Sequence, residues 1–412
     1  MNKLQQLIDA YCPNGVEYLT LNQISTKITD GMHSLPNSIV PDGGYPILSA
    51  QNINNGIIDK NTSKFVSQEI FDIENRRTDI KEGDVLLTIV GAIGRVAVVP
   101  DGLKALFQRS ICVIKPDHNK ILSEYLRFTL ESSSIQNYIQ INAHGAAQKG
   151  IYLDKINKIK IPLPPLEVQR EIVRVLDKFT MLSAELSAEL SARQKQYSFY
   201  REHLLSFQNN IKIYPLRYVI RHSCSGSTPS KGKSEYYDNG SIPWIRTQDV
   251  RFNEIYSVDS YITELAVKET AAKWIPENCV IVAISGASAG RCAINKIRAT
   301  TNQHCLNLEI DSQKALYRYV YHCVCQKYQD LLAKKQGARG DLNSTLILDT
   351  EIPVPPLDVQ QRIVNVLDNF DAICSDLNIG LPAEISARQK QYEYYRDLLL
   401  SFKNIDNITD RA

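Results

Sequence analysis

The sequence predicts an α+β fold with a pseudo-twofold internal repeat. Two strand-rich domains are each followed by a long helix, and the two helices pair as an antiparallel coiled coil. A proline-led block at residues 161–179, IPLPPLEVQREIVRVLDKF, returns at 352–370 as IPVPPLDVQQRIVNVLDNF. A second block at 191–207, SARQKQYSFYREHLLSF, returns at 386–402 as SARQKQYEYYRDLLLSF. Such self-similarity indicates one structural unit that occurs twice.

Composition is that of a soluble globular protein of two or three domains, with 412 residues of which 43% are hydrophobic and 22% charged. No apolar run approaches the roughly 18 residues that span a membrane. The start, MNKLQQLIDAYCPNG, lacks the apolar core of a signal peptide. We therefore expect a cytoplasmic protein whose nine cysteines are reduced thiols packed in the cores.

The two domains preceding the helices, residues 1–160 and 212–351, have strand patterns in equivalent places. Residues 84–99 and 279–294 are each two β-branched runs broken by a glycine turn. The segments YPILSAQNI at 45–53 and IPWIRTQDV at 242–250 also correspond. Because the halves differ almost everywhere between these anchors, we expect one fold with two different surfaces.

The first long helix lies within residues 161–211. The prolines of IPLPP hold the chain extended and mark the helix start. Apolar residues then follow a heptad pattern from Ile172 to Leu186 and resume at Leu190. The four-residue step between them is a stutter made by the tandem repeat SAELSAEL at 183–190. At about 1.5 Å per residue, an unbroken helix over 166–207 would be roughly 63 Å long.

The second helix and the C-terminal tail, residues 352–412, repeat this pattern with one difference. The segment GLPAE contains Gly380 and Pro382, which should kink or break the helix. Matching seams in one chain favour pairing of the two helices, which would hold the domains apart. The alternative is that each helix packs only on its own domain.

The sequence contains no recognisable catalytic or metal-binding motif. The loop GSTPSKGKS at 226–234 resembles a Walker A loop, but its first glycine stands one place too early. LPPL and VPPL lack the polar residue and the aromatic that an amino-methyltransferase tetrapeptide needs around its prolines. The histidines and cysteines have no zinc-site spacing. We therefore predict no catalytic residues and no metal ligands. Separately, basic residues outnumber acidic ones in residues 212–351, which favours an anionic partner for this segment.

The repeated blocks, each leading to RQKQYxxYRxxLLSF, resemble the shared helical regions of type I restriction–modification specificity (S) subunits. The resemblance covers the whole chain in the order recognition domain, helix, recognition domain, helix. SAELSAEL is similar to the tandem tetrapeptide of one branch of that family. The departure from symmetry at NIGLPAE leaves open whether the two helices present identical docking faces.

The resemblance implies a non-catalytic DNA-binding subunit of an adenine methyltransferase and endonuclease complex. Two target-recognition domains would each read one half of a bipartite site in double-stranded DNA. The helices would set the half-site spacing and dock two modification (methyltransferase) subunits, which in turn recruit restriction (motor–nuclease) subunits. S-adenosylmethionine, ATP and magnesium would belong to these partners, and no cofactor to this chain.

Candidate DNA-contacting residues are polar loop residues, mostly at equivalent places in the two halves, because arginine reads guanine and asparagine or glutamine reads adenine. In the first domain they are His33, Ser34, Asn37, Gln51, Asn52, Arg95, Gln108, Arg109 and Gln148. In the second they are Ser227, Thr228, Lys231, Lys233, Arg246, Gln248, Arg251, Arg291, Gln303, His304 and Arg339. The alternative for each is a solvated loop residue, and we expect Trp244 in the core.

Candidate partner-binding residues are the helix tyrosines Tyr197, Tyr200, Tyr392 and Tyr395. For Tyr197 and Tyr392, burial between the helices is the alternative. Two other functions remain open: a coiled-coil scaffold without DNA reading, and a stand-alone nucleotide-binding or methyltransferase enzyme. Salt-dependent, sequence-selective DNA binding would distinguish the first from a specificity subunit, and unaided turnover of ATP would support the second.

Overall fold

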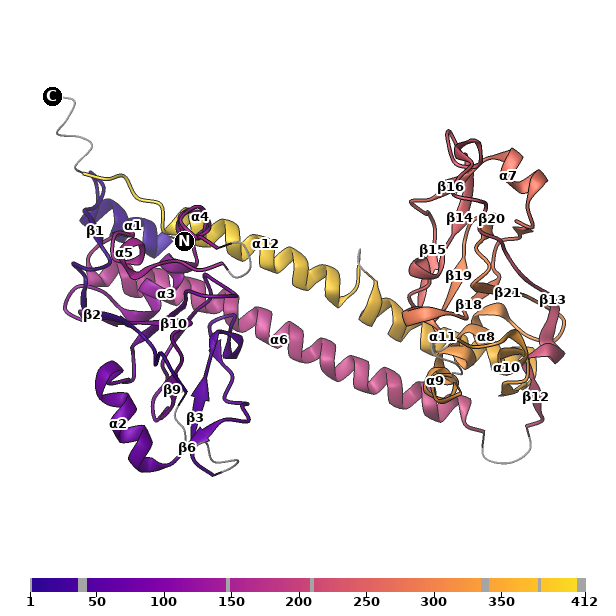
Figure 1. Cartoon of the computed structure of the whole chain (residues 1–412), viewed down its shortest axis with the longest axis horizontal. Coiled ribbons are helices and arrows are strands. Elements are labelled where there is room, and N and C mark those ends of the chain that lie inside the picture. Colours follow the sequence, from indigo (N-terminus) through magenta and orange to yellow (C-terminus); the bar gives the residue numbers. More distant parts are fainter. Residues whose placement is uncertain are drawn as a thin grey trace. The chain divides into compact units, whose positions relative to one another are not determined.

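The computed structural model describes residues 2–35, 43–145, 149–207, 211–334, 341–376 and 379–405. It divides into two compact units (Figure 1). Unit 1 comprises residues 1–186 and 385–412, and unit 2 comprises residues 187–384. The predicted α+β fold with two domains and two long helical regions is confirmed.

Unit 1 is built on two small sheets with the orders β2-β10-β7-β8 and β6-β3-β9, and on the pairs β1-β11 and β4-β5. Its helices are α1 (Asn2–Tyr11), α2 (Gln68–Thr78), α3 (Ser123–Glu131), α4 (Ser133–Ile141) and α5 (Leu153–Ile156). Its strands are β1 (Tyr18–Thr20), β2 (Ser25–Asp30), β3 (Tyr45–Leu48), β4 (Ile53–Asn54), β5 (Ile57–Ile58), β6 (Phe65–Val66), β7 (Val85–Thr88), β8 (Val96–Val98), β9 (Leu106–Phe107), β10 (Ile111–Pro116) and β11 (Lys160–Pro162).

Unit 2 repeats this plan with the orders β13-β21-β18-β19-β15 and β16-β14-β20-β17 and the pair β12-β22. Its helices include α7 (Glu264–Glu269), α8 (Tyr317–Gln326), α9 (Tyr328–Ala333) and α10 (Ser344–Leu348). Its strands are β12 (Ile213–Pro215), β13 (Ile220–Ser225), β14 (Ile242–Ile245), β15 (Asn253–Ile255), β16 (Tyr261–Ile262), β17 (Trp274–Ile275), β18 (Val280–Ala283), β19 (Cys292–Asn295), β20 (Ala299–Thr301), β21 (Cys305–Ile310) and β22 (Glu351–Pro353).

The first long helix, α6 (Leu166–Leu205), is continuous for 40 residues through the SAEL repeat. The second region is two helices, α11 (Leu357–Ser375) and α12 (Leu381–Leu399). The break predicted at Gly380 and Pro382 is thus confirmed. A Cβ on Gly380 would lie 2.5 Å from the Ala372 carbonyl oxygen, so this turn accepts only glycine without movement.

The helices pair with antiparallel direction inside each unit (Figure 1). In unit 1, the rings of Phe179 on α6 and Tyr395 on α12 stack with centroids 5.5 Å apart. In unit 2, Tyr197 and Tyr200 on α6 stack on Phe370 of α11, at 6.0 and 5.3 Å. The alternative that each helix packs only on its own domain is therefore wrong, because α6 contributes to the cores of both units.

A buried glutamine ties the start of α6 to the rest of unit 1. Gln169 is 0% exposed, and its Oε1 accepts the Leu122 N–H at 3.0 Å. Its Nε2 donates to the carbonyl oxygens of Lys120, at 2.9 Å, and Pro164, at 2.8 Å. All three bonds go to backbone groups outside α6, so the side chain ties the start of the helix to the segment before α3 and to the proline hinge.

Unit 2 repeats this clamp with Gln360, which is also 0% exposed. Its Oε1 accepts the Leu316 N–H at 2.9 Å. Its Nε2 donates to the carbonyl oxygens of Lys314, at 3.2 Å, and Pro355, at 2.8 Å. The glutamine of the Val-Gln pair shared by the two sequence blocks therefore anchors the start of the helix in both units.

Candidate nucleic-acid interface

In both units, two parallel strands end side by side and lead into the loops that carry the predicted reading residues. In unit 1, β3 pairs with β9 through Leu48 and Phe107. In unit 2, β14 pairs with β20 through Ile245 and Thr301. Residues that follow such strand ends leave from one edge of a sheet. In unit 1 these residues include Gln51, Gln108 and Arg109, and in unit 2 they include Arg246, Gln248, Gln303 and His304.

A glycine in each unit lets a third loop lie against this strand end. The N–H of Met32 donates to Phe107 at 2.7 Å, and the N–H of Ser227 donates to Thr301 at 2.9 Å. A Cβ on Gly31 or Gly226, the residues just before, would come within 2.1 and 1.8 Å of the same carbonyl oxygens. Gly226 is therefore needed for the close approach of this loop to the strand end.

The structure also argues against a Walker A loop at residues 226–234. Lys233 precedes only a three-residue 3-10 helix, Ser234–Tyr236, and not a long helix whose N-terminus could bind phosphate.

In unit 2, three side chains of this edge form one polar group. The Thr228 hydroxyl donates to Gln303 Oε1. Gln303 Nε2 lies 3.2 Å from His304 Nε2. Trp244 is 7% exposed and donates its indole N–H to the Ser227 carbonyl at 3.1 Å, so its predicted place in the core is confirmed. The edge thus carries an amide, a hydroxyl and an imidazole that contact one another.

In unit 1, the equivalent edge is more charged. His33 Nε2 lies 2.9 Å from Asp30 Oδ2, and the His33 side chain is 62% exposed. Arg77 donates to the backbone of Asp30 and Gly31 and so holds this loop. Arg109 is exposed, and within the described residues its guanidinium has no hydrogen bond or ion pair. Arg109 and Gln303 occupy equivalent positions, two residues after the strand ends.

Some predicted side chains are already engaged. Asn52 caps its own turn, accepting from the Ser49 N–H at 2.9 Å and donating to Asp59 and Asn61 at 3.0 Å. Arg95 donates to the Ile53 carbonyl at 3.1 Å. These bonds stabilise loops, so their roles in DNA contact stay predictions.

In unit 2, Lys233 lies 3.7 Å from Glu269, and Arg251 Nε donates to the Gln248 carbonyl at 2.5 Å. The guanidinium carbon of Arg246 lies 5.9 Å from the Trp244 ring, and its Nε is buried without a partner among the described residues. Gln51 and Gln248 lie in the short 3-10 helices Ala50–Asn52 and Thr247–Asp249, and both are exposed. The other predicted residues lie on loops, where Ser34 and Lys231 are exposed and Gln108 and Arg291 are half-buried. Asn37, Gln148 and Arg339 lie outside the described residues.

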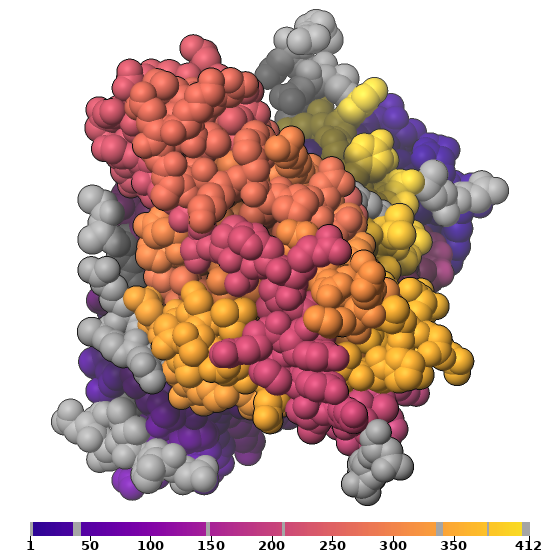
Figure 2. Space-filling view, turned by 90° about the vertical axis from the view of Figure 1, so that its right-hand side faces the viewer, coloured from indigo at the N-terminus to yellow at the C-terminus, as the bar shows by residue number. Residues whose placement is uncertain are grey.

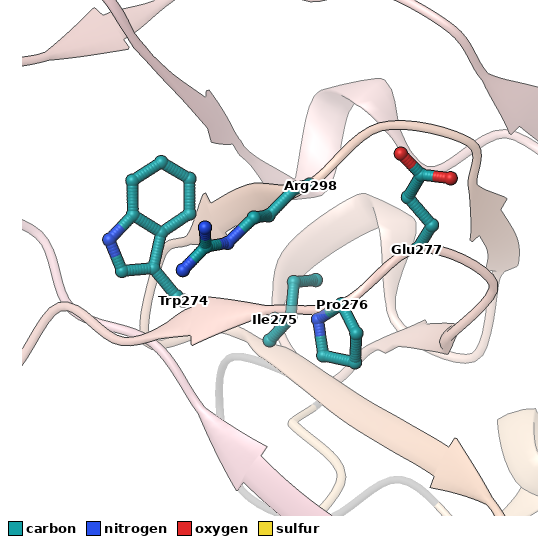
Figure 3. Close-up of a pocket in the computed structure, with 5 residues that line it drawn as sticks. All are labelled: Trp274, Ile275, Pro276, Glu277 and Arg298. Atoms are coloured by element: carbon teal, nitrogen blue, oxygen red, sulfur yellow. The ribbon is translucent and has the colours of Figure 1, made fainter.

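Sequence reasoning missed an aromatic–cation pair on the edge strand β17. Trp274 pairs with Thr300 of β20 and is 38% exposed. The Arg298 guanidinium lies 4.5 Å from the Trp274 ring centroid (Figure 3). They border a shallow depression of about 530 Å³ together with Ile275, Pro276 and Glu277. The sequence has only two tryptophans, so Trp274 was available as a signal. Its exposure could not be predicted, because a strand pattern does not show whether the strand lies at the edge or in the centre of a sheet.

The predicted helix tyrosines divide into two groups. Tyr197 and Tyr392 are 9% and 8% exposed, so the alternative of burial in the helical seams describes them. Tyr200 and Tyr395 are half-buried in aromatic stacks. The exposed aromatics are their neighbours Phe199, 62% exposed, and Tyr394, 64% exposed, which occupy equivalent places in the repeat. The motif YxxY itself, read with helical periodicity, could have separated these faces.

A charged network joins β15 and α8 of unit 2 to the helix α11. Asp368 on α11 accepts from Arg318 Nε at 2.5 Å and from His322 Nε2 at 2.8 Å. Arg318 also pairs with Glu254 on β15. Burial alone would raise the pKa of Asp368, but His322 and Arg318 together hold it below its ordinary value of 3.8. Asp368 is thus held as a carboxylate that links α8 to α11.

Substituting Asp368→Asn is expected to lower the free energy of unfolding of unit 2 by about 2–3 kcal/mol near neutral pH, because His322 and Arg318 lose their anion. A carboxylate whose pKa is lower in the folded protein stabilises the fold at pH values above its ordinary pKa. This stability is lost as the pH falls through the lowered pKa of the folded protein. The difference between the proteins should therefore shrink below pH 3.8. Denaturant unfolding across pH measures it. The exposed carboxylate Asp358 is the control, with Asp358→Asn changing stability by about 0.5 kcal/mol or less.

Within the described residues there is no cluster of three or more histidine, cysteine or acidic side chains that could hold a metal ion. The cysteines are all free, and eight of the nine are buried. No helix in the described part of the chain is long and apolar enough to cross a membrane.

Comparison with known proteins links this geometry to one family. A model described as "Type I restriction modification DNA specificity domain" matches residues 13–193 and 220–387, one match for each half. The specificity subunit of the type I restriction enzyme EcoR124I/EcoR124II of Escherichia coli is 38% identical over 71% of this chain and 74% of its own length. A putative type I specificity subunit of Haemophilus influenzae is 32% identical over 67% and 72%.

Two solved structures share the fold. The type I restriction–modification S subunit of M. genitalium matches with a TM-score of 0.56 and 16% identity, covering 94% of this chain and 96% of its own. A chain from a structural study of assembly and conformational transition in a type I R-M system matches with a TM-score of 0.58, 16% identity, and coverage of 94% and 97%.

Proposed function

The chain belongs to the family of type I restriction–modification DNA specificity subunits, and from this premise we propose that its two units read the two halves of a split DNA site. One observation carries the proposal. The same strand-end position bears Arg109 in unit 1 and Gln303 in unit 2, two residue types that pair with base edges through two hydrogen bonds. One fold with two different reading residues suits a target with two different halves.

Affinity in this proposal comes mainly from phosphate contacts and specificity from the strand-end side chains. Lys231, Arg291 and the Trp274–Arg298 pair are suited to the phosphate backbone, because no acidic partner of these cations lies among the described residues. Glu277 lines the same depression, but its carboxylate points away from the Arg298 guanidinium (Figure 3).

The experiment co-expresses the chain with its modification subunit in a host without DNA methylation and maps N6-methyladenine by long-read sequencing. A single split motif that disappears when this chain is omitted is the expected result. A well-formed complex that methylates no defined motif would instead favour the scaffold function.

We propose that α6 and its partner helices set the spacing of the half-sites, since α6 runs unbroken through SAELSAEL. Inserting a third SAEL after Leu190 adds about 6 Å of helix, against about 3.4 Å per base pair. The spacer in the methylated motif should lengthen by roughly one or two base pairs, with both half-sites unchanged. The same mapping measures this, and an unchanged spacer would contradict the idea.

For the modification subunits we propose docking on the exposed aromatics of the helices. Phe199→Ala or Tyr394→Ala should weaken binding of a modification subunit by about 2 kcal/mol, as truncating an interface aromatic does. Thermal stability should change little, because both side chains are more than 60% exposed. Calorimetric titration measures the affinity. Wild-type affinity in both variants would place the docking surface elsewhere.

The chain's own role in this proposal is non-catalytic. Methyl transfer, ATP-driven motion and cleavage would reside in the modification and restriction subunits, with S-adenosylmethionine, ATP and magnesium bound there. Turnover of ATP by the purified chain alone would contradict this division of labour.

A further inference from the structure

The loop that follows β2 in unit 1 is joined to the reading edge through its own backbone. Met32 is 7% exposed and belongs to one core cluster with Phe71 of α2. Its N–H donates to the Phe107 carbonyl at 2.7 Å, and its carbonyl accepts the Arg109 N–H at 2.8 Å. His33 directly follows Met32 in the chain. The imidazole therefore extends from a residue whose backbone is bonded to that of Arg109.

Arg77, in the last turn of α2, holds the same loop from the helix. Its guanidinium donates to Asp30 Oδ1 at 3.0 Å and to the Asp30 carbonyl oxygen at 2.6 Å. It also donates to the Gly31 carbonyl oxygen. The second carboxylate oxygen of Asp30, Oδ2, lies 2.9 Å from His33 Nε2. Asp30 thus links Arg77 on the helix to His33 on the loop.

The other half shows what kind of position His33 occupies. His33 is equivalent to Thr228, because the residues just before them make the same backbone bond to a strand end. The Thr228 hydroxyl donates to Gln303, which is the counterpart of Arg109. This position therefore belongs to the reading edge in unit 2, and we infer the same for His33 in unit 1.

The two units hold this loop in different ways. Helix α7 takes the place of α2 in unit 2, because each follows a strand that pairs with β14 or β3 in antiparallel direction. The α7 region forms part of the orange-red surface at the upper end of unit 2 (Figure 2). In the described part of the chain no side chain of α7 hydrogen-bonds to residues 225–228, and the Trp244 indole holds the Ser227 carbonyl instead. Among the described residues, the clamp from helix to loop is a feature of unit 1.

We propose that Arg77 is a positioning residue for base reading in unit 1. Through Asp30 it holds His33 beside Arg109, where the imidazole donates to or accepts from a base edge next to the base that Arg109 reads. Holding the side chain before DNA binds lowers the entropic cost of the contact. Arg77 itself does not touch the base. The inference rests on the proposed function, in which unit 1 reads one half-site.

The test uses the full chain in complex with its modification subunit and the split motif mapped for the wild type. Arg77→Ala and His33→Ala should make the motif degenerate at the same position of one half, with the other half unchanged. Binding to duplexes that carry each base in turn should show discrimination at that position falling about tenfold in both variants. The double variant should be no more degenerate there than His33→Ala, because Arg77 acts through His33.

Arg76→Ala is the matched control, since Arg76 is the exposed neighbour on α2 and has no hydrogen bond or ion pair among the described residues. It should leave discrimination unchanged. Asp30→Asn, which keeps the size of the side chain, is a second variant and should give the same degeneracy as Arg77→Ala. Calorimetry of each variant reports whether unit 1 remains folded.

Three results would overturn the inference. They are full discrimination in Arg77→Ala, an even loss of affinity for all duplexes, and a double variant whose losses add. A split motif that Arg77→Ala leaves intact would count against this inference alone. A wild-type complex that methylates no split motif would overturn the proposed function, and the inference with it.

Discussion

Replacing Gln360 by leucine is expected to lower the free energy of unfolding of unit 2 by about 3 kcal/mol. Leucine fits a similar volume but leaves the Leu316 N–H and the Lys314 and Pro355 carbonyls without the amide that now bonds them. Each unsatisfied buried group costs about 1–3 kcal/mol, and the site is closed to solvent at Gln360, which is 0% exposed. Differential scanning calorimetry of the full chain measures this.

The repeat supplies a matched pair for this experiment. Gln169→Leu should destabilise unit 1 by a similar amount and leave the unit 2 transition in place, because its three bonds lie within unit 1. Gln361→Leu, on the exposed side of α11, should change stability by about 0.5 kcal/mol or less. Equal effects of Gln360→Leu and Gln361→Leu would mean that the clamp contributes little.

Substituting Arg109→Ala is expected to weaken binding of the cognate duplex by roughly 10- to 100-fold, corresponding to about 1–3 kcal/mol for one two-bond base contact. Because Arg109 lies in unit 1, the methylated motif should become degenerate at one position in one half only. Gln303→Ala should do the same in the other half. The readout combines long-read mapping of N6-methyladenine with binding to duplexes that carry each base in turn.

A phosphate-contacting residue serves as the control. Lys231→Ala should weaken binding about equally for all sequences and reduce the salt dependence, without changing the motif. Degeneracy in both halves after one substitution at Arg109 or Gln303 would contradict the assignment of one unit to each half.

The sequence predicted the ends of the long helices well, because proline and glycine determine the conformation of their own backbone. Proline pairs marked the helix starts, and Gly380 with Pro382 marked the break between α11 and α12. The sheets depend on pairings far apart in sequence. Parallel contact of β14 with β20, for example, joins Ile245 to Thr301, which no local pattern records.

The missed residues have physical explanations. Gln169 and Gln360 are polar residues on amphipathic helices and would ordinarily face water, but both are fully buried because their bonds are all to backbone. Their identity in both blocks was the available signal. Phe199 and Tyr394 lie two residues from buried tyrosines, which is about 200° around the helix, so helical periodicity was the available signal that their rings face solvent. No pattern in the sequence identifies which loop side chains contact bases.

The two-part composition of unit 1 has a consequence for synthesis on the ribosome. Its core contains Leu21 and Val85 near the start of the chain, together with Tyr392 and Leu400 near the end. Unit 2, residues 187–384, lies wholly between them. At about 5–20 residues per second, the N-terminal domain waits roughly 10–40 s for the roughly 200 residues that precede its closing helix. The unit that emerges first is therefore the last to be completed, and nascent chains that stop before residue 385 leave its apolar seam uncovered.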